Sequence, residues 1–195
     1  MRALVASVAA AVLFTALLGF GYPALMTGFA AVAFPNKSKG SLIEVDGTAV
    51  GSRLAAQGFK ETKYFHPRPS ATSPAYNAAA TTFANLGPTN PDLAKAVEAN
   101  ARAILRLEAP YDPGLTIGQI PVDAVTTSGS GIDPDISPAY AELQARRVAA
   151  VRGLPLATVQ QLIEENTDGR SLDFFGEPGV NVLELNIALD KEQAQ

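Results

Sequence analysis

The chain contains no cysteine and only one histidine among its 195 residues. The lack of cysteine excludes disulfide bonds, thiol nucleophiles, cysteine-ligated zinc and iron–sulfur clusters. A single histidine excludes metal sites built from several imidazoles, so we expect no metal site except one in which oxygen atoms bind a hard cation. Lysine and arginine total 15, against 19 acidic residues, and they form no cluster. Nucleic-acid binding is therefore not expected, because it requires clustered positive charge.

Charge is also absent from one long stretch near the N-terminus, residues 3–36. A membrane hydrocarbon core is about 30 Å thick and a helix rises about 1.5 Å per residue, so roughly 20 apolar residues span it. Residues 4–25 meet this requirement. We therefore predict a transmembrane anchor over residues 1–34, with Pro23 bending or ending the helix near Tyr22.

A cleaved signal peptide is the alternative for this segment, since residues 31–33 (Ala-Val-Ala) fit a small-x-small cleavage pattern. The apolar stretch is longer than a usual signal core of about 7–15 residues, which favours the anchor. Small side chains recur at every fourth position, and such a ridge would let a partner helix approach closely in lipid. An alanine-rich composition could also produce this ridge by chance. The ridge consists of Ala3, Ser7, Ala11, Thr15 and Gly19.

The remaining residues, 35–195, are long enough for one soluble domain with one core, and we expect an α/β fold. Residues 42–45 are typical of a strand that runs into an Asp46-Gly47 hairpin turn. Residues 67–91 show no periodicity and are rich in Pro, Ser, Thr, Asn and Ala. They therefore predict a long loop.

Helix starts are marked at two places by an N-cap residue followed by proline, at Asn90-Pro91 and at Ser137-Pro138. The first helix should end before Pro110 and the second at Gly153, and a third is expected from about residue 155 to 166. A short strand is expected at residues 121–125. A half-buried final strand is expected where apolar and other residues alternate, at Leu183, Leu185, Ile187 and Leu189.

A glycine-rich loop before the second helix is the sharpest chemical candidate: Ser128, Gly129, Ser130 and Gly131. Exposed backbone N–H groups at such a place can hold phosphate. The loop has no lysine and is followed by Asp133 and Asp135, so it is not a P-loop. The alternative is a tight turn capped by serine and aspartate side chains.

A catalytic triad of His66, Ser130 and Asp133 is conceivable, although nothing in their spacing requires it. His66 lies between aromatic residues and prolines, where a packed, hydrogen-bonded histidine is the simpler interpretation. We expect Arg68 in the same segment to pair with a carboxylate, either within the domain or on a partner.

Four segments together resemble the KdpC subunit family of the bacterial Kdp potassium pump, in their order, their spacing and the N-terminal anchor. The segments are YFHPRPSA at residues 64–71, NLGPTNP at 85–91, SGIDPDISP at 130–138 and GEPGVNVLELN at 176–186. The resemblance covers nearly the whole chain.

This resemblance implies a non-catalytic accessory subunit of an ATP-driven, high-affinity potassium importer in a bacterial inner membrane. The implied partners are a channel-like potassium-binding subunit and a P-type ATPase subunit. The family has been described as a catalytic chaperone that raises the ATPase subunit's affinity for ATP. On that description ATP is shared with the ATPase subunit, no cofactor is bound covalently, and the implied contacts are Ser128, Gly129, Ser130, Gly131 and Gln144.

Two features of the resemblance oppose direct ATP contact. Asp135 stands where the family usually has histidine, which adds negative charge beside the expected nucleotide. The family's arrangement also places the soluble domain outside the cytoplasm, whereas ATP is inside. We therefore favour stabilisation of the complex and shaping of the potassium entrance. The alternatives are a freestanding extracytoplasmic enzyme that uses Ser130 or His66, and a secreted binding module released by cleavage after Ala33.

Overall fold

The computed structural model describes residues 1–193, which form two compact units. The first unit is Met1–Val50 and the second begins at Gly51. The second unit combines helices with a small sheet, so the expected α/β class of the soluble part is confirmed. The boundary of the anchor at residue 34 stays a prediction.

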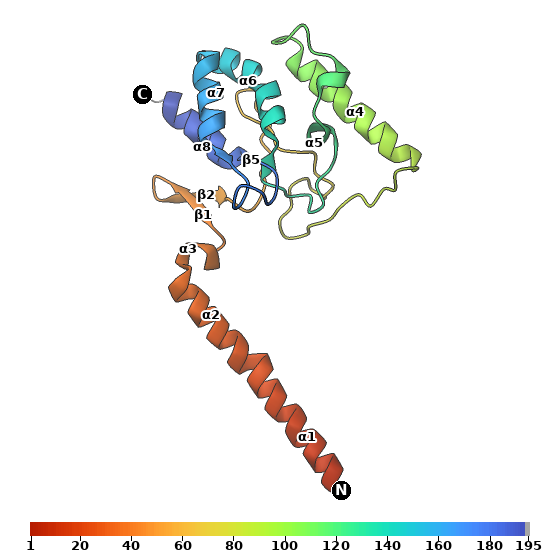
Figure 1. The fold of residues 1–195 in the computed structure, drawn as a ribbon, viewed down its shortest axis with the longest axis vertical. Coiled ribbons are helices and arrows are strands. Elements are labelled where there is room, and N and C mark those ends of the chain that lie inside the picture. The colour runs from red at the N-terminus through yellow and green to blue at the C-terminus, as the bar shows by residue number, and fades with distance from the viewer. Residues whose placement is uncertain (194–195) are drawn as a thin grey trace. The chain divides into compact units, whose positions relative to one another are not determined.

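The N-terminal unit begins with one long apolar helix, drawn in red and orange in Figure 1. It comprises α1 (Arg2–Phe14), the π-helical segment η1 (Thr15–Gly21) and α2 (Tyr22–Ala33). Over Arg2–Ala33 the helix is long and apolar enough to cross a membrane, with a mean hydropathy of 2.3. The sequence therefore predicted the spanning helix correctly.

The expectation that this helix ends near Tyr22 is wrong, because helical structure continues to Ala33. Proline lacks an N–H group, and its ring clashes with the preceding turn of a regular α-helix. Here the turn before Pro23 is π-helical, and the Tyr22 N–H group donates to the Leu17 carbonyl five residues earlier. The wider turn accommodates the proline without breaking the helix.

After this helix come a short helix, α3 (Pro35–Ser38), and a hairpin of β1 (Leu42–Val45) and β2 (Thr48–Ser52), whose last two residues belong to the second unit. Asp46 and Gly47 connect the strands with φ angles of 51° and 74°. A two-residue turn with both φ angles positive matches the twist of the flanking strands. The predicted strand and its hairpin turn are confirmed.

The second unit is built on four longer helices: α4 (Pro91–Glu108), α6 (Pro138–Arg152), α7 (Leu156–Glu165) and α8 (Val182–Gln193). Between α4 and α6 lie the 3₁₀ turn η2 (Ile117–Gln119) and the short helix α5 (Val122–Val125). The three-stranded antiparallel sheet has the order β3 (Asp135–Ile136), β5 (Gly179–Asn181), β4 (Thr167–Asp168). In Figure 1, α7 stands between α6 and α8, and α4 lies on the other side of α6.

Helix boundaries follow the predicted signals. The Asn90 side chain accepts a hydrogen bond from the Asp92 N–H group at 2.9 Å, and the Ser137 hydroxyl accepts one from the Tyr140 N–H group at 3.0 Å. Gly153 ends α6 in the left-handed conformation, with φ of 68°. The three predicted helices are therefore confirmed, and residues 67–90 contain no helix or strand, as expected for the long loop.

Two strand predictions are wrong. Residues 122–125 form α5, and the adjacent residues Ala124 and Val125 are both buried. Neighbours in a strand would point to opposite faces. The apolar residues of 183–189 lie on α8, where Val182, Leu185 and Leu189 follow a helical spacing and are buried. Leucine, glutamate and alanine favour helices, so propensity and helical spacing outweigh the alternating pattern.

The core of the second unit lies between the helices, with α6 at its centre. Small side chains on α6 let the neighbouring elements approach closely, and Phe65, just before the long loop, is completely buried against this core. The small α6 residues in the core are Ala141, Ala145, Val148 and Ala149.

Candidate functional site

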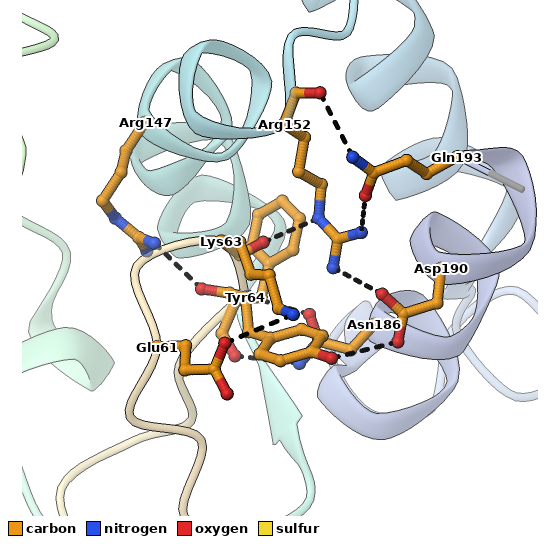
Figure 2. A network of polar contacts seen from close by, with 9 residues as sticks. Glu61, Lys63, Tyr64, Arg147, Arg152, Asn186, Asp190 and Gln193 are labelled. Atoms are coloured by element: carbon orange, nitrogen blue, oxygen red, sulfur yellow. Dashed lines mark hydrogen bonds and ion pairs between the residues drawn. The ribbon is translucent and has the colours of Figure 1, made fainter.

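The segment 61–66 begins with a turn, in which the Tyr64 N–H group donates to the Glu61 carbonyl at 3.1 Å, and it belongs to none of the described helices or strands. Its backbone carbonyl groups are bonded instead by arginine side chains of α6, shown in Figure 2. Arg147 donates to the carbonyls of Thr62 and, at 2.9 Å, Tyr64. Arg152 donates to the Lys63 carbonyl at 2.8 Å. Charged donors therefore satisfy backbone carbonyl groups that no helix or sheet bonds.

Two buried amide side chains complete this arrangement. Asn186 of α8 accepts from the Phe65 N–H group at 2.8 Å and donates to the Phe65 carbonyl at 3.0 Å. Gln144 of α6 does the same for His66, at 2.8 and 3.0 Å. Both side chains are 1% exposed, so each satisfies backbone groups that water cannot reach.

A buried ion pair supports the arginine that holds this segment. Arg147 donates to the Glu108 carboxylate at 2.9 Å and to the Gln144 side-chain oxygen at 2.8 Å. The Arg147 and Glu108 side chains are 0% and 2% exposed. Burial raises the pKa of the Glu108 carboxyl, and the charge of Arg147 opposes this rise. The pair therefore depends on both partners, since either charge alone would be buried without compensation.

A second cluster lies at the surface end of the same segment (Figure 2). Arg152 pairs with Asp190 at 2.8 Å and lies 5.0 Å from the centre of the Tyr64 ring. The Tyr64 hydroxyl donates to the same Asp190 carboxylate at 3.2 Å. The Lys63 ammonium group lies 4.9 Å from the centre of the Tyr64 ring and forms an ion pair with Glu61 at 3.2 Å. Residues 62–66 are thus each bonded to α6 or α8.

Sequence reasoning missed the role of Arg147, Glu108 and Asn186. One signal was present: Gln144 and Arg147 are polar residues on the apolar face of α6, beside Ala145 and Val148. A charged residue on such a face is almost never fully buried without a partner. The identity of its partner could not be read from the spacing.

The predicted phosphate loop forms a closed turn. The Ser128 hydroxyl accepts from the Gly131 N–H group at 2.9 Å, and the Ser130 hydroxyl accepts from the Ile132 N–H group at 3.2 Å. Gly131 has a φ angle of 72°, and a side chain there would lie 2.7 Å from Thr72. Its carbonyl accepts from the Ser70 hydroxyl at 2.6 Å. Ser128 and Gly131 are therefore required by the turn itself.

The surroundings of this turn carry few groups for a phosphate. A hollow of about 470 Å³ beside Ser128 and Gly129 is lined by apolar and uncharged residues, including Phe83, Leu86 and Leu93. Among the described residues, no hydrogen bond or ion pair joins Gln144 to the loop; the glutamine binds His66 and Arg147 instead. Contact between ATP and these five residues stays a prediction.

The charged residues near the loop are engaged with one another. Arg68 pairs with Asp133 at 2.9 Å, which confirms the expected ion pair of Arg68 with a carboxylate of the domain. Asp135 accepts from Asn181 at 3.0 Å. Burial raises the pKa of the Asp135 carboxyl, the hydrogen bond from Asn181 lowers it, and the nearby Asp133 raises it further. Side chains of the domain therefore already engage both carboxylates.

The structure does not assemble a triad from His66, Ser130 and Asp133. The His66 Nε2 atom lies 3.1 Å from the Glu61 carbonyl, Ser130 bonds within its own turn and Asp133 pairs with Arg68. Burial lowers the pKa of His66, and the charge of Arg147 lowers it further. His66 is a packed residue whose backbone is held by Gln144.

Comparison with known proteins gives one consistent family. A family model described as KdpC, the c chain of a K⁺-transporting ATPase, matches residues 4–191. Similar proteins named "Potassium-transporting ATPase KdpC subunit" include one from Beijerinckia indica, 50% identical over 92% of this chain and 88% of its own length. One from Herpetosiphon aurantiacus is 51% identical over 95% of this chain and 94% of its own length. One from Sorangium cellulosum is 52% identical over 90% of each chain.

Proposed function

The chain belongs to the KdpC family, the accessory c chain of a potassium-transporting ATPase, and from this premise we propose that it works by stabilising the pump and shaping its potassium entrance. Its partners are then a channel-like potassium-binding subunit and a P-type ATPase subunit. The single helix anchors it in the bacterial inner membrane, with the domain from residue 35 outside the cytoplasm. The alternative of a freestanding enzyme is wrong, because the family is an accessory subunit of the ATPase and not its catalytic subunit.

One observation carries the preference for a structural role over nucleotide contact. Both polar atoms of the Gln144 side chain bond to the His66 backbone, and its oxygen also accepts from Arg147. The side chain is also 1% exposed, so it could reach ATP only by releasing the segment that it holds. An effect on the ATPase subunit's affinity for ATP would then pass through contacts between subunits.

The surface charge supports a role at the potassium entrance. The chain carries a net charge of −4. A broad groove along α6 and α7 is lined by Glu142, Glu164 and Glu165 and by no basic residue. Such a surface raises the local concentration of cations.

The small-residue ridge of the membrane helix gives a test of assembly. Leucine at Ala11 and Gly19 should prevent the close approach of a partner helix. We expect these changes to weaken retention of the other pump subunits about tenfold in detergent, the equivalent of about 1.4 kcal/mol. Copurification from membranes, with the subunits identified by mass spectrometry, measures this.

The matched control is leucine at Val8 and Val12, which are 56% and 64% exposed on the same helix but outside the ridge. These changes should leave retention intact. If both sets leave it intact, the ridge reflects composition only. If the unaltered chain copurifies with no ATPase subunit, the proposed function itself is wrong.

A further inference from the structure

Residues 170–177 connect the sheet strands β4 and β5 through a tight turn that is closed at its base. Ser171 and Phe175 exchange two backbone hydrogen bonds, each 2.9 Å long. Below them, Arg170 pairs with Glu177 at 2.6 Å. These contacts hold the turn in one shape although it has few neighbours.

The turn presents large apolar side chains to solvent. Leu172 is 76% exposed, Phe174 64% and Phe175 58%, and the two phenylalanine rings are 4.1 Å apart. Other strongly exposed large apolar residues of the described second unit, such as Leu54, Phe83 and Val122, are isolated along the sequence. Three such side chains within four residues form an apolar patch of the kind that marks an interaction surface.

The backbone of this tip is strained. Leu172 and Asp173 have φ angles of 54° and 64°, in the left-handed region. A leucine there crowds its Cβ atom against the backbone, and such a residue persists only where its surroundings enforce the conformation. A glycine would fit Leu172's position at no steric cost, so the sequence keeps an apolar side chain there against its conformational preference.

The charge within the tip selects the kind of partner. Asp173 lies between Leu172 and Phe174, and its carboxylate has no ion pair among the described residues. A carboxylate at the centre of an apolar tip opposes insertion into lipid. It complements an apolar pocket that contains a basic side chain, since a protein interface combines aromatic anchors with a charge pair.

We propose that the tip formed by Leu172, Asp173, Phe174 and Phe175 is an anchor that inserts into an apolar pocket with a basic group on another subunit of the potassium-transporting ATPase. This inference rests on the proposed function, because it requires the chain to be assembled with that ATPase.

Photocrosslinking in the assembled pump tests the contact directly. Benzoylphenylalanine is placed at Phe174 in the full chain, coexpressed with the other pump subunits, and native membranes are irradiated. Phe83, which is 52% exposed in a different loop, is the matched control position. We expect an adduct with a pump subunit from position 174 and none from position 83. Adducts with lipid only, no adduct, or equal adducts at both positions would overturn the anchor.

Substitutions separate docking from folding. Phe174→Ala and Leu172→Gly should each weaken retention of the partner subunits about tenfold, while Phe83→Ala should not. Leu172→Gly relaxes the left-handed backbone, so the thermal midpoint of the chain should stay constant or rise. Asp173→Asn keeps a residue that tolerates this conformation but removes the charge, and it should weaken retention as well.

The outcomes distinguish this inference from the proposed function. If the unaltered chain copurifies with the ATPase while Leu172→Gly and Phe174→Ala change retention less than twofold, the anchor is wrong and the accessory role stands. If the unaltered chain copurifies with no ATPase subunit, both are wrong.

Discussion

Arg147→Ala should lower the free energy of unfolding by about 3–5 kcal/mol, because it leaves a buried charge without its partner. The Glu108 side chain is 2% exposed, and its carboxylate accepts a hydrogen bond from Arg147 at 2.9 Å. The same change removes the donors to the carbonyls of Thr62 and Tyr64. Denaturant unfolding of the full chain in detergent, followed by tyrosine fluorescence, measures the loss.

Arg146→Ala is the matched control for this prediction. Arg146 is the preceding residue of α6, its side chain is 58% exposed, and it lies 3.7 Å from Asp112. An exposed pair of this kind contributes at most about 1 kcal/mol. Equal losses at positions 146 and 147 would contradict the view that the buried pair holds the segment 61–66. The double variant Glu108→Ala, Arg147→Ala should lose less than the sum of the single variants.

The loss in Arg147→Ala should also depend on pH. Burial already raises the pKa of Glu108, and removing Arg147 removes the charge that opposes this rise. The folded state then binds a proton more tightly than the unfolded chain, whose glutamate has the ordinary value of 4.5. Part of the lost stability should therefore return as the pH falls from the raised folded pKa toward 4.5.

Gln144→Ala should lower the free energy of unfolding by about 2–4 kcal/mol and leave ATP use unchanged. The change leaves the backbone N–H and carbonyl groups of His66 without their partners in a buried place, each at a cost of about 1–3 kcal/mol. In the assembled pump, the ATP concentration for half-maximal hydrolysis should stay within about threefold of the unaltered value, or about 0.7 kcal/mol.

Gln160→Ala is the control for Gln144→Ala, since Gln160 is exposed on α7 and, among the described residues, its side chain bonds only to the Glu142 side chain, at 3.0 Å. It should change neither stability nor ATP use. A tenfold weakening of ATP use by Gln144→Ala, with the complex still intact, would contradict the structural role and support direct nucleotide contact.

The helix boundaries were predictable because they depend on neighbouring residues. Asn90 and Ser137 each cap their helix with a side chain that reaches two or three residues ahead. The error at residues 183–189 has the same local origin. Leu185 and Leu189 fit both the alternating and the helical spacing, and the helix propensity of the segment decides between the two.

The candidate site was much less predictable because its partners are distant in sequence. Arg147 and Glu108 are 39 positions apart, and Asn186 and Phe65 are 121 apart. No local pattern specifies such a pair, since the fold alone brings the two side chains together. Ser128 and Gly131 were predicted as site residues because serine and glycine are typical of turns, and they do form a turn.

We expect the domain from residue 35 to lie outside the cytoplasm, away from ATP. The local charges Lys37 and Lys39 oppose it under the positive-inside rule, but large domains are translocated largely regardless of such charges. The chain has no native cysteine, so Lys95→Cys introduces a single thiol on α4 at a side chain that is 74% exposed. A membrane-impermeant maleimide should label this thiol in intact spheroplasts to the same extent as in lysed ones. Labelling that appears only after lysis would place the domain beside cytoplasmic ATP and contradict the extracytoplasmic location.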